Sequence, residues 1–298
     1  MKHILVGFAA ALLLLSTLQG SALAQSTAAP ANATGPEKQM FARSTGYEQY
    51  MGRWSRRLVP AFIAFAGVRN GDRVLDVGTG TGAVAAELAA AVPASEIVGI
   101  DPSDGFLKFA RANVASGRVR FEVGDAQSLH FPDASFDQTL ALLVLNFVPD
   151  PGKAIREMRR VTRPGGTVSA CVWDYDAGMQ MIRYFWDEAV ALEPALAAKD
   201  QRRMKFARQG ELGELWRQAG LVDVREQPLV LEQHFTSFED YWQPFLGQTG
   251  AAGAMVATRG DEWRRQLEAG LRKRVLGDRP DGPFTLKARA WCVRGQAG

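Results

Sequence analysis

The sequence predicts an α/β protein built on a mostly parallel sheet with helices on both faces. Short apolar runs rich in β-branched residues alternate along the chain with stretches of helical spacing. This alternation is typical of parallel strands joined by helical crossovers. A glycine-rich turn directly follows the first of these runs. The 298 residues, of which 47% are hydrophobic, can bury a full core, so global disorder is excluded.

The elements follow one another in a regular order. The expected strands are short apolar runs bounded by turn residues: 73–77, 96–101, 119–123, 136–145, 166–173, 222–231 and 284–293. The expected helices have apolar residues at helical spacing: 47–65, 82–91, 103–114, 150–161 and 211–219. Ser103 is expected to cap its helix, and Asp150-Pro151 to open the next one.

Two helical insertions interrupt the alternation, near residues 179–206 and 237–277. Both lie between expected strands, where additions can cover a site at the carboxyl edge of the sheet. They are rich in aromatic residues, which at helical spacing favour a role in the core over a role in ligand binding. The alternative is that these aromatics line a pocket for a partly apolar ligand.

The N-terminus resembles an export signal. Residues 1–24 combine a basic start, an apolar run and a final Ala22-Leu23-Ala24, which is the pattern of a secretory signal peptide. An uncleaved anchor, or a start codon placed too early, would explain the same residues. Residues 25–39 have the composition of a flexible linker, and the folded domain is expected over residues 40–298. The apolar run is shorter than a membrane-spanning helix needs, and no other stretch is long enough, so no stable span is expected.

Composition excludes several classes of function. The net charge of +3 is too small for a dedicated nucleic-acid binder. The 2 Cys and 3 His argue against a disulfide scaffold and against a structural zinc site, so no metal is expected. Cys171 and Cys292 both fall in expected strands and are interpreted as inert thiols of the core.

The glycine loop is the most informative motif. Asp76 lies near the end of the first strand, and Gly78, Gly80 and Gly82 follow in a G-x-G-x-G pattern before a helix. Glycines let a ligand approach the backbone, and the helix N-terminus presents free N–H groups. The spacing differs from the G-x-G-x-x-G of dinucleotide sites, and no Gly-Lys-Ser/Thr follows. Because Asp76 would repel pyrophosphate, the loop favours a ligand that carries both an amine and a carboxylate.

Two more acids end the next two strands. Asp101 stands about 20 residues past the glycines, where an acid commonly accepts hydrogen bonds from ribose hydroxyls. Asp125 follows the third strand, where a carboxylate can accept from an exocyclic amine such as that of adenine. Together with Asp76, these acids are expected to meet at one crevice, because parallel strands place their carboxyl ends on the same edge.

The run from residue 74 to residue 166 resembles the class I S-adenosylmethionine-dependent methyltransferases, and among them the group that includes the ubiquinone/menaquinone C-methyltransferases. The resemblance rests on five pieces in order: 74–82, 98–101, 124–126, 131–137 and 163–166. It implies a Rossmann-like sheet of seven strands, the last of them antiparallel. Thr79 stands where such proteins often carry Cys or Gly, which should not weaken cofactor binding.

The resemblance also implies roles for single residues. S-adenosyl-L-methionine would be the cofactor, with its amine near Asp76 and its ribose on Asp101. The remaining expected contacts divide among four parts of the cofactor. Gly78, Gly80 and Thr81 would line the methionine part, Pro102 and Phe106 the nucleoside, Asp125 and the Ala126 backbone the adenine, and Leu143 and Asn146 the sulfonium. The N-terminal helix, with Tyr47, Tyr50, Arg53 and Trp54, would cap the crevice or only pack on the sheet.

The expected function is methyl transfer to a small-molecule acceptor by in-line attack on the sulfonium methyl. Such chemistry needs mainly alignment and exclusion of water. No catalytic residue is identified, although Asp174, Tyr175 and His234 are candidates for a general base. The alternatives are an exported binding protein without activity and a nucleotide-dependent oxidoreductase. The signal-like segment favours export to the periplasm, whereas a cofactor made inside cells favours the cytoplasm. Neither the acceptor nor the oligomeric state can be read from the sequence.

Overall fold

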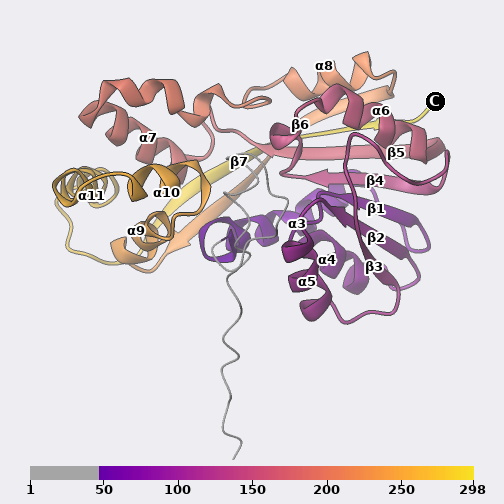
Figure 1. The fold of residues 1–298 in the computed structure, drawn as a ribbon, viewed down its shortest axis with the longest axis horizontal. Coiled ribbons are helices and arrows are strands. Elements are labelled where there is room, and N and C mark those ends of the chain that lie inside the picture. Colours follow the sequence, from indigo (N-terminus) through magenta and orange to yellow (C-terminus); the bar gives the residue numbers. More distant parts are fainter. Residues whose placement is uncertain (1–46) are drawn as a thin grey trace, which may run out of the picture.

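A computed structural model describes residues 47–298. The signal-like segment, the linker and the first residues of the expected domain lie outside the described residues. The described chain folds around a seven-stranded sheet in the order β3-β2-β1-β4-β5-β7-β6 (Figure 1). The strands are β1 Arg73–Val77, β2 Glu96–Asp101, β3 Val119–Val123, β4 Phe136–Leu142, β5 Thr162–Trp173, β6 Val222–Phe235 and β7 Phe284–Gln296.

The strand directions agree with the predicted Rossmann-like topology. β1, β2, β3, β4 and β5 pair in parallel, and β7 runs antiparallel to both β5 and β6. The central strand β1 is buried from Val74 to Val77, as expected for a parallel strand covered on both faces. The predicted fold class is therefore confirmed, including the antiparallel last strand.

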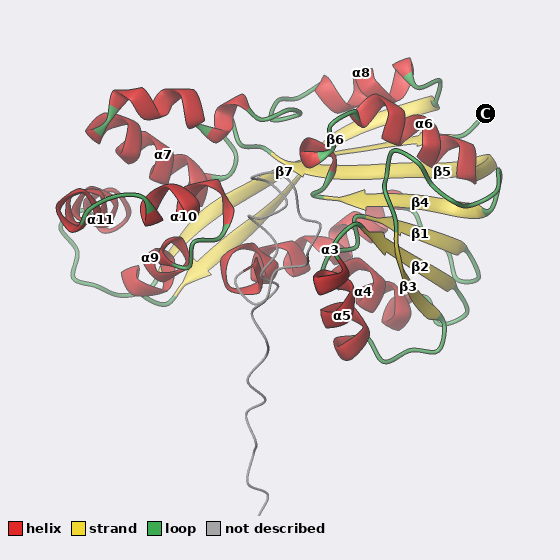
Figure 2. Cartoon of the chain, in the orientation of Figure 1, coloured by secondary structure: helices red, strands yellow, loops and turns green. Residues whose placement is uncertain are grey.

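Helices cover both faces of the sheet (Figure 2). One face is covered by α3 Arg53–Ala66, α4 Ala83–Ala91 and α5 Asp104–Asn113, and the other by α6 Pro151–Val161 and α8 Glu211–Gln218. Ser103 caps α5 by accepting a hydrogen bond from the Phe106 N–H, and Asp150 caps α6 through the Lys153 N–H. Both caps satisfy backbone donors that would otherwise lack a partner.

The two insertions come together as one unit, which we call the helical layer. It consists of α7 Gln180–Leu192, α9 Phe238–Leu246, α10 Gly250–Ala257 and α11 Asp261–Leu276, with the short turns η3 Pro194–Lys199 and η4 Gln201–Arg203. The layer lies beyond the carboxyl ends of the parallel strands (Figure 1). Its aromatic side chains form its core: Phe185 stacks on Phe245 with 4.6 Å between ring centroids, and the Tyr241 hydroxyl donates to the Met181 carbonyl.

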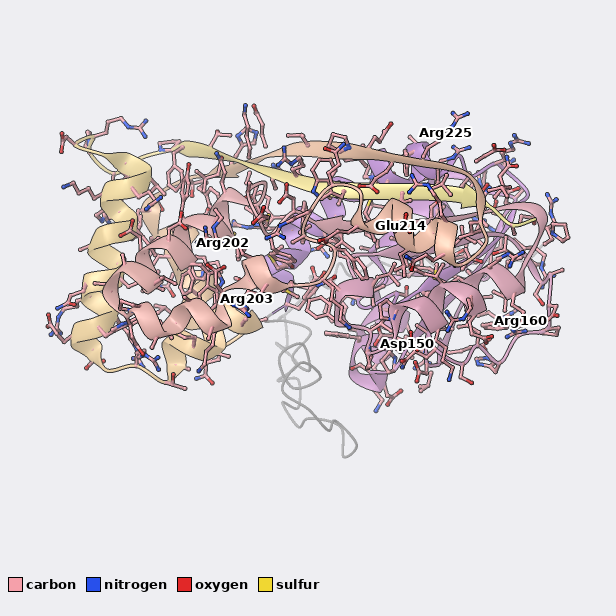
Figure 3. All side chains as sticks on the ribbon, turned by 90° about the horizontal axis from the view of Figure 1, so that it is seen from above. Asp150, Arg160, Arg202, Arg203, Glu214 and Arg225 are labelled. Carbon is pink, nitrogen blue, oxygen red and sulfur yellow. A yellow bond between two sulfur atoms is a disulfide. The ribbon has the colours of Figure 1, made fainter. Side chains whose placement is uncertain are left out.

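A buried ion pair holds the turns of the helical layer in place. The Arg183 guanidinium donates two hydrogen bonds to the Asp200 carboxylate, of 3.0 and 2.8 Å. Burial disfavours the charge on Asp200, but Arg183 and Arg202 outweigh it and hold the pKa of that carboxyl below its ordinary value. Figure 3 shows Arg202 and Arg203 next to each other on this segment. The η3–η4 segment is therefore anchored to α7 by charge.

Several boundaries differ from the sequence prediction. The predicted strand 136–145 stops at Leu142, because Leu143 adopts a left-handed φ of 60°. A short turn, η2 Leu145–Phe147, follows. The predicted N-terminal helix begins with a π-helical turn, η1 Glu48–Gly52, that leads into α3. β6 and β7 are longer than expected, because they pair with each other beyond the rest of the sheet and carry the helical layer.

The interpretation of the two cysteines as free thiols is wrong. Cys171 of β5 and Cys292 of β7 lie directly opposite each other in the antiparallel register. They form a disulfide across 121 residues of sequence. The pairing depends on the register of two distant strands, so the spacing of the cysteines in the sequence does not reveal it. Separately, no helix in the range 47–298 has both the length and the apolar character needed to cross a bilayer.

Candidate functional site

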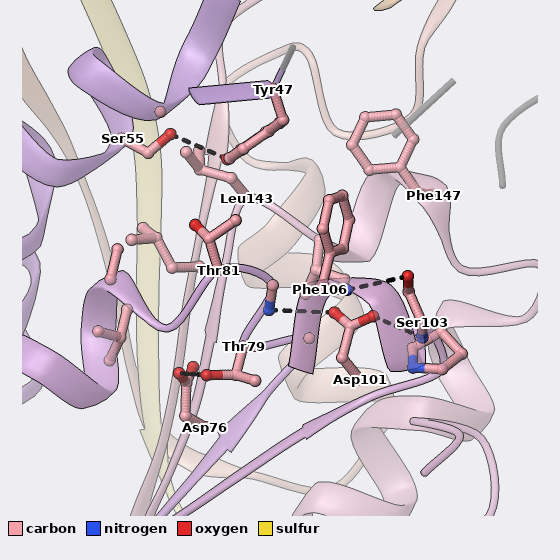
Figure 4. A pocket seen from close by; sticks show the side chains of 18 of the residues that line it. Tyr47, Ser55, Asp76, Thr79, Thr81, Asp101, Ser103, Phe106, Leu143 and Phe147 are labelled. Carbon is pink, nitrogen blue, oxygen red and sulfur yellow. Dashed lines mark hydrogen bonds between the residues drawn. The ribbon is translucent and has the colours of Figure 1, made fainter. Parts of the chain in front are cut away.

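A cavity of about 400 Å³, which we call the first cavity, opens at the carboxyl ends of β1, β2 and β4 (Figure 4). The glycine loop after β1 forms one wall and the start of α5 forms another. The turn after β4 and the η1 turn complete the enclosure. This is the edge at which open α/β sheets bind their ligands.

The glycine loop has a backbone that only glycine adopts without strain. Gly78, Gly80 and Gly82 have φ angles of 71°, 55° and 84°. The N–H groups of Gly78 and Thr79 both donate to the Ile100 carbonyl, at 2.8 and 2.9 Å, and so tie the loop to β2. A Cβ on Gly78 would come within 2.4 Å of the Val144 side chain. The loop therefore approaches the end of β4 more closely than a larger residue would allow.

Two buried carboxylates face the first cavity without a basic partner among the described residues. Asp76 accepts a hydrogen bond of 2.6 Å from the Thr79 hydroxyl, and burial raises its pKa to about 7. Asp101 accepts from the N–H groups of Gly80 (3.0 Å) and Ser103 (2.8 Å). Its pKa is raised to about 6, because burial outweighs these two bonds. Burial without a counter-charge disfavours ionisation, so this pair suits a ligand that supplies positive charge and hydroxyl donors.

The η1 turn and α3 cover the cavity from the N-terminal side. The Tyr47 hydroxyl shares a hydrogen bond of 3.0 Å with Ser55, and its ring lies 5.9 Å from that of Phe106 (Figure 4). The Thr81 hydroxyl donates to the Glu48 carboxylate at 2.6 Å. These contacts link the N-terminal turn to the glycine loop. Sequence reasoning anticipated a capping helix but missed Glu48 and Ser55, whose only signal was their position on that helix.

The structure brings together most of the residues expected to hold the cofactor. The walls of the first cavity include Asp76, Gly78, Gly80, Thr81, Asp101, Pro102, Phe106 and Leu143. Asp125 and Ala126 are not among its lining residues. The exposed Asp125 carboxylate instead accepts from the Gln127 N–H at 2.9 Å. Val123, at the end of β3, lines the cavity in their place, so the adenine-reading role of Asp125 and Ala126 stays a prediction.

Asn146 does not line the first cavity, and its expected place beside the sulfonium stays a prediction. It lines a neighbouring hollow, also of about 400 Å³, which we call the second cavity. This cavity lies between the sheet edge and the helical layer, and its walls include Tyr50, Phe147, Tyr175, Ile182 and Met204. Phe147 lines both cavities, so the two share a wall. Sequence reasoning did not foresee this second cavity, because its walls come from segments far apart in the chain.

The three candidate general bases lie in different environments. Asp174 is buried and paired with Arg289, whose Nε donates to it at 2.7 Å, and it lines neither cavity. His234 lies within β6, exposed, and contacts Thr285. Tyr175 lines the second cavity, and burial raises its pKa well above the ordinary value. At neutral pH Tyr175 is therefore a hydrogen-bond donor and not a base.

Comparison with known proteins agrees with this geometry. The "Methyltransferase domain" family matches residues 75–170, which hold the glycine loop, both buried acids and the β4 turn. Demethylmenaquinone methyltransferase of Geobacillus kaustophilus is 36% identical over 177 residues, 54% of this chain and 75% of the relative. The enzyme of the same name from Roseiflexus castenholzii is 33% identical over 207 residues, 63% of this chain and 85% of the relative.

A solved structure shares the fold. Phosphoethanolamine N-methyltransferase 2 of Haemonchus contortus, solved with S-adenosylhomocysteine, has a TM-score of 0.54 and 18% identity. The match covers 86% of this chain and 57% of that one. Fold and site thus define an S-adenosylmethionine-dependent methyltransferase of class I. The chain belongs to the methyltransferase-domain family and is similar to the ubiquinone/menaquinone C-methyltransferase group.

The residues of the first cavity fit S-adenosylmethionine, which is the cofactor of this family. The Asp76 and Asp101 carboxylates are buried without a cationic partner in the described part of the chain. A cofactor with an ammonium group, a sulfonium and a ribose diol supplies the charge and the donors that such a pair lacks. The activity is methyl transfer, and these findings favour it over the oxidoreductase and the inactive binding protein.

Proposed function

We propose that the chain methylates a small, flat acceptor that binds in the second cavity. The main support is that Phe147 lines both cavities. An acceptor in the second cavity would therefore lie beside a cofactor in the first. The walls of the second cavity combine aromatic and aliphatic side chains with hydroxyl, amide and charged groups. Such a lining suits a small ring with one or two polar substituents.

The proposed roles divide between the two cavities. The first would hold the cofactor, with Asp101 accepting from the ribose hydroxyls and Asp76 near the ammonium group. When bound, S-adenosylmethionine supplies a methyl group that is already activated by the positive sulfur. The acceptor forms one new bond to the methyl carbon while the carbon–sulfur bond breaks, and the acceptor releases one proton to solvent. The protein then contributes alignment and exclusion of water.

We place the new bond on a ring carbon of the acceptor. Two relatives, each matched over most of its own length, are named demethylmenaquinone methyltransferase. Their name supports carbon methylation of a quinol-like ring. Tyr50, Asn146 and Tyr175 all line the second cavity. They could hold the ring hydroxyls by hydrogen bonds and turn a ring carbon toward the shared wall at Phe147.

The variant Asn146→Leu tests this assignment, because leucine has nearly the same shape but no amide. With labelled cofactor and a panel of quinols, phenols and amines, transfer to quinols and phenols should fall about tenfold, as for a lost hydrogen bond in a buried site. Affinity for S-adenosylhomocysteine should stay unchanged. His234→Asn, on exposed β6, is the control. If the variant weakens cofactor binding and leaves transfer intact, the second cavity is not the acceptor site. Carbon-13 NMR of the product separates carbon from oxygen methylation.

We also propose that the protein works in an oxidising compartment. The Cys171–Cys292 disulfide supports this, because disulfides persist mainly outside the reducing cytosol. The signal-like start of the sequence points the same way. Protein purified from its native host should resist alkylation under denaturing conditions until reductant is added. N-terminal sequencing of that material would show whether Gln25 is the first residue. Two free thiols in the native protein would contradict the proposal.

A further inference from the structure

Two polar groups that line the second cavity have no hydrogen-bond partner among the described residues. The Tyr50 side chain is 3% exposed and its hydroxyl has no hydrogen-bond partner. The Asn146 side chain is 9% exposed and its Nδ2 likewise has none. Buried polar groups are nearly always hydrogen-bonded, and both residues line the cavity. Each group can donate a hydrogen bond to a ligand oxygen.

Other residues that line the second cavity carry positive charge. Lys199, Arg203 and Lys205 all line it and are exposed. Lys205 donates to the Pro149 carbonyl at 3.0 Å, which ties it to the loop after Asn146. Within residues 47–298, neither Lys199 nor Arg203 belongs to an ion pair. Three cations on one short segment therefore face a cavity without a matching set of acids.

Asp200 is the one acid among the described residues that line the second cavity, and it does not neutralise these cations. Asp200 lines the cavity, but it is 6% exposed. Its carboxylate accepts from Arg183 at 3.0 and 2.8 Å and from Arg202 at 3.0 Å. Its charge is therefore already balanced by two arginines. The charge that remains available to a ligand is positive.

We propose that the acceptor is an anion: a small ring with an oxygen at Tyr50 and Asn146, and a carboxylate or phosphate group at Lys199 and Arg203. This rests on the proposed function, because it assigns the second cavity to the acceptor. The two sets of residues differ in chemistry. The buried Tyr50 and Asn146 offer neutral donors, and Asn146 is the chain neighbour of Phe147 in the shared wall, whereas the exposed Lys199 and Arg203 offer charge. An acceptor with both features would be oriented with its ring toward the cofactor.

Binding to the protein loaded with S-adenosylhomocysteine tests the proposal without turnover. The probes are 4-hydroxybenzoate, 4-hydroxyphenyl phosphate and the neutral 4-hydroxybenzamide, measured by calorimetry. Both anions should bind about tenfold more tightly than the amide, as expected for two cations at a partly enclosed site. The tighter of the two anions identifies the charged group. Equal affinities for all three probes, or binding of none, overturn the proposal.

The double variant Lys199→Gln/Arg203→Gln should remove the advantage of the anions and leave amide binding unchanged. Both side chains are exposed, so the fold should survive. The control, Arg69→Gln/Arg225→Gln, removes the same charge at exposed positions that line neither cavity. Figure 3 places Arg203 on the helical layer and Arg225 over the sheet. An equal loss of anion affinity in both variants would mean a general charge effect and overturn the site.

The same probes separate this proposal from the proposed function. If the anions bind as expected but no probe or quinol is methylated, the anion site is supported and the acceptor role of the cavity is contradicted. If only neutral acceptors are methylated, and the double variant leaves their KM unchanged, methyl transfer stands and the anion proposal falls. Raising the salt concentration should weaken binding of the anions and not of the amide.

Discussion

Replacing Asp101 by Asn should stabilise the protein without cofactor and weaken cofactor binding at the same time. Burial raises the pKa of Asp101 from its ordinary 3.8 to about 6. At pH 7.5 the acid is ionised in both the folded and the unfolded chain, and burying its charge lowers the unfolding free energy by about 3 kcal/mol. Asparagine removes the charge but keeps only one acceptor oxygen, so one of the N–H groups of Gly80 and Ser103 loses its partner, at a cost of about 1–3 kcal/mol. The variant should therefore gain at most about 2 kcal/mol of unfolding free energy, a rise in Tm of several degrees at most.

Cofactor binding should change in the opposite sense. The carboxylate already accepts from the N–H groups of Gly80 and Ser103, and its remaining capacity is expected to meet ribose hydroxyls. Losing one charge-assisted hydrogen bond costs about 2 kcal/mol, which is about a 30-fold weaker Kd for S-adenosylhomocysteine. Calorimetry and thermal melts on the same samples measure both quantities. The exposed Asp261→Asn is the control. A lower Tm together with an unchanged Kd would refute the reasoning.

Three further predictions concern Asp76, Gly78 and Arg183. The pKa of Asp76 is raised to about 7 in the folded chain. The protonated acid therefore contributes to folding stability below its unfolded pKa, and this contribution is lost as pH rises through about 7. Affinity for S-adenosylhomocysteine should rise over the same pH range, and calorimetry in two buffers should detect the proton that Asp76 releases on binding. Gly78→Ala should lower the unfolding free energy by about 1–2 kcal/mol and weaken cofactor binding, because its φ is 71° and a Cβ has no room. Gly165→Ala is the control, since its φ is 75° and a Cβ would meet nothing within 4 Å. In denaturant melts Gly165→Ala should lose only the free energy of backbone strain. Arg183→Ala should cost about 3 kcal/mol, because it breaks a buried pair with Asp200, and should raise the acceptor KM more than the cofactor Kd; equal effects on both would contradict an anchoring role for this pair.

The cofactor edge was predictable because its geometry is local. A buried strand, a glycine turn and a helix follow one another within a few residues, and the parallel sheet rule places Asp76 and Asp101 at one edge. Each step depends on neighbours in the chain, and the structure agrees for both acids. Asp125 does not line the first cavity, since its carboxylate accepts from the Gln127 N–H in the loop after β3, and its role toward adenine stays a prediction.

The cysteines and the candidate bases illustrate the limit of local reasoning. Cys171 and Cys292 are opposite each other only because of the register between β5 and β7. Asp174 is neutralised by Arg289, which comes from the last strand. His234 was expected after its strand, but β6 extends past it, because pairing with β7 continues to Phe235. In each case the deciding contact joins residues far apart in the sequence.

The sequence by itself determined the class of sheet, the glycine loop of the first cavity and the two acids beside that loop. Strand periodicity, glycine spacing and the order of elements are properties of short segments, so they can be read from the sequence. Only the tertiary structure decided that a second cavity exists. Its walls come from η1, the turn after β4, the η3–η4 segment and the start of α10, and no local pattern relates them. They meet because the helical layer packs against the end of the sheet and a buried Arg183–Asp200 pair holds its turns there.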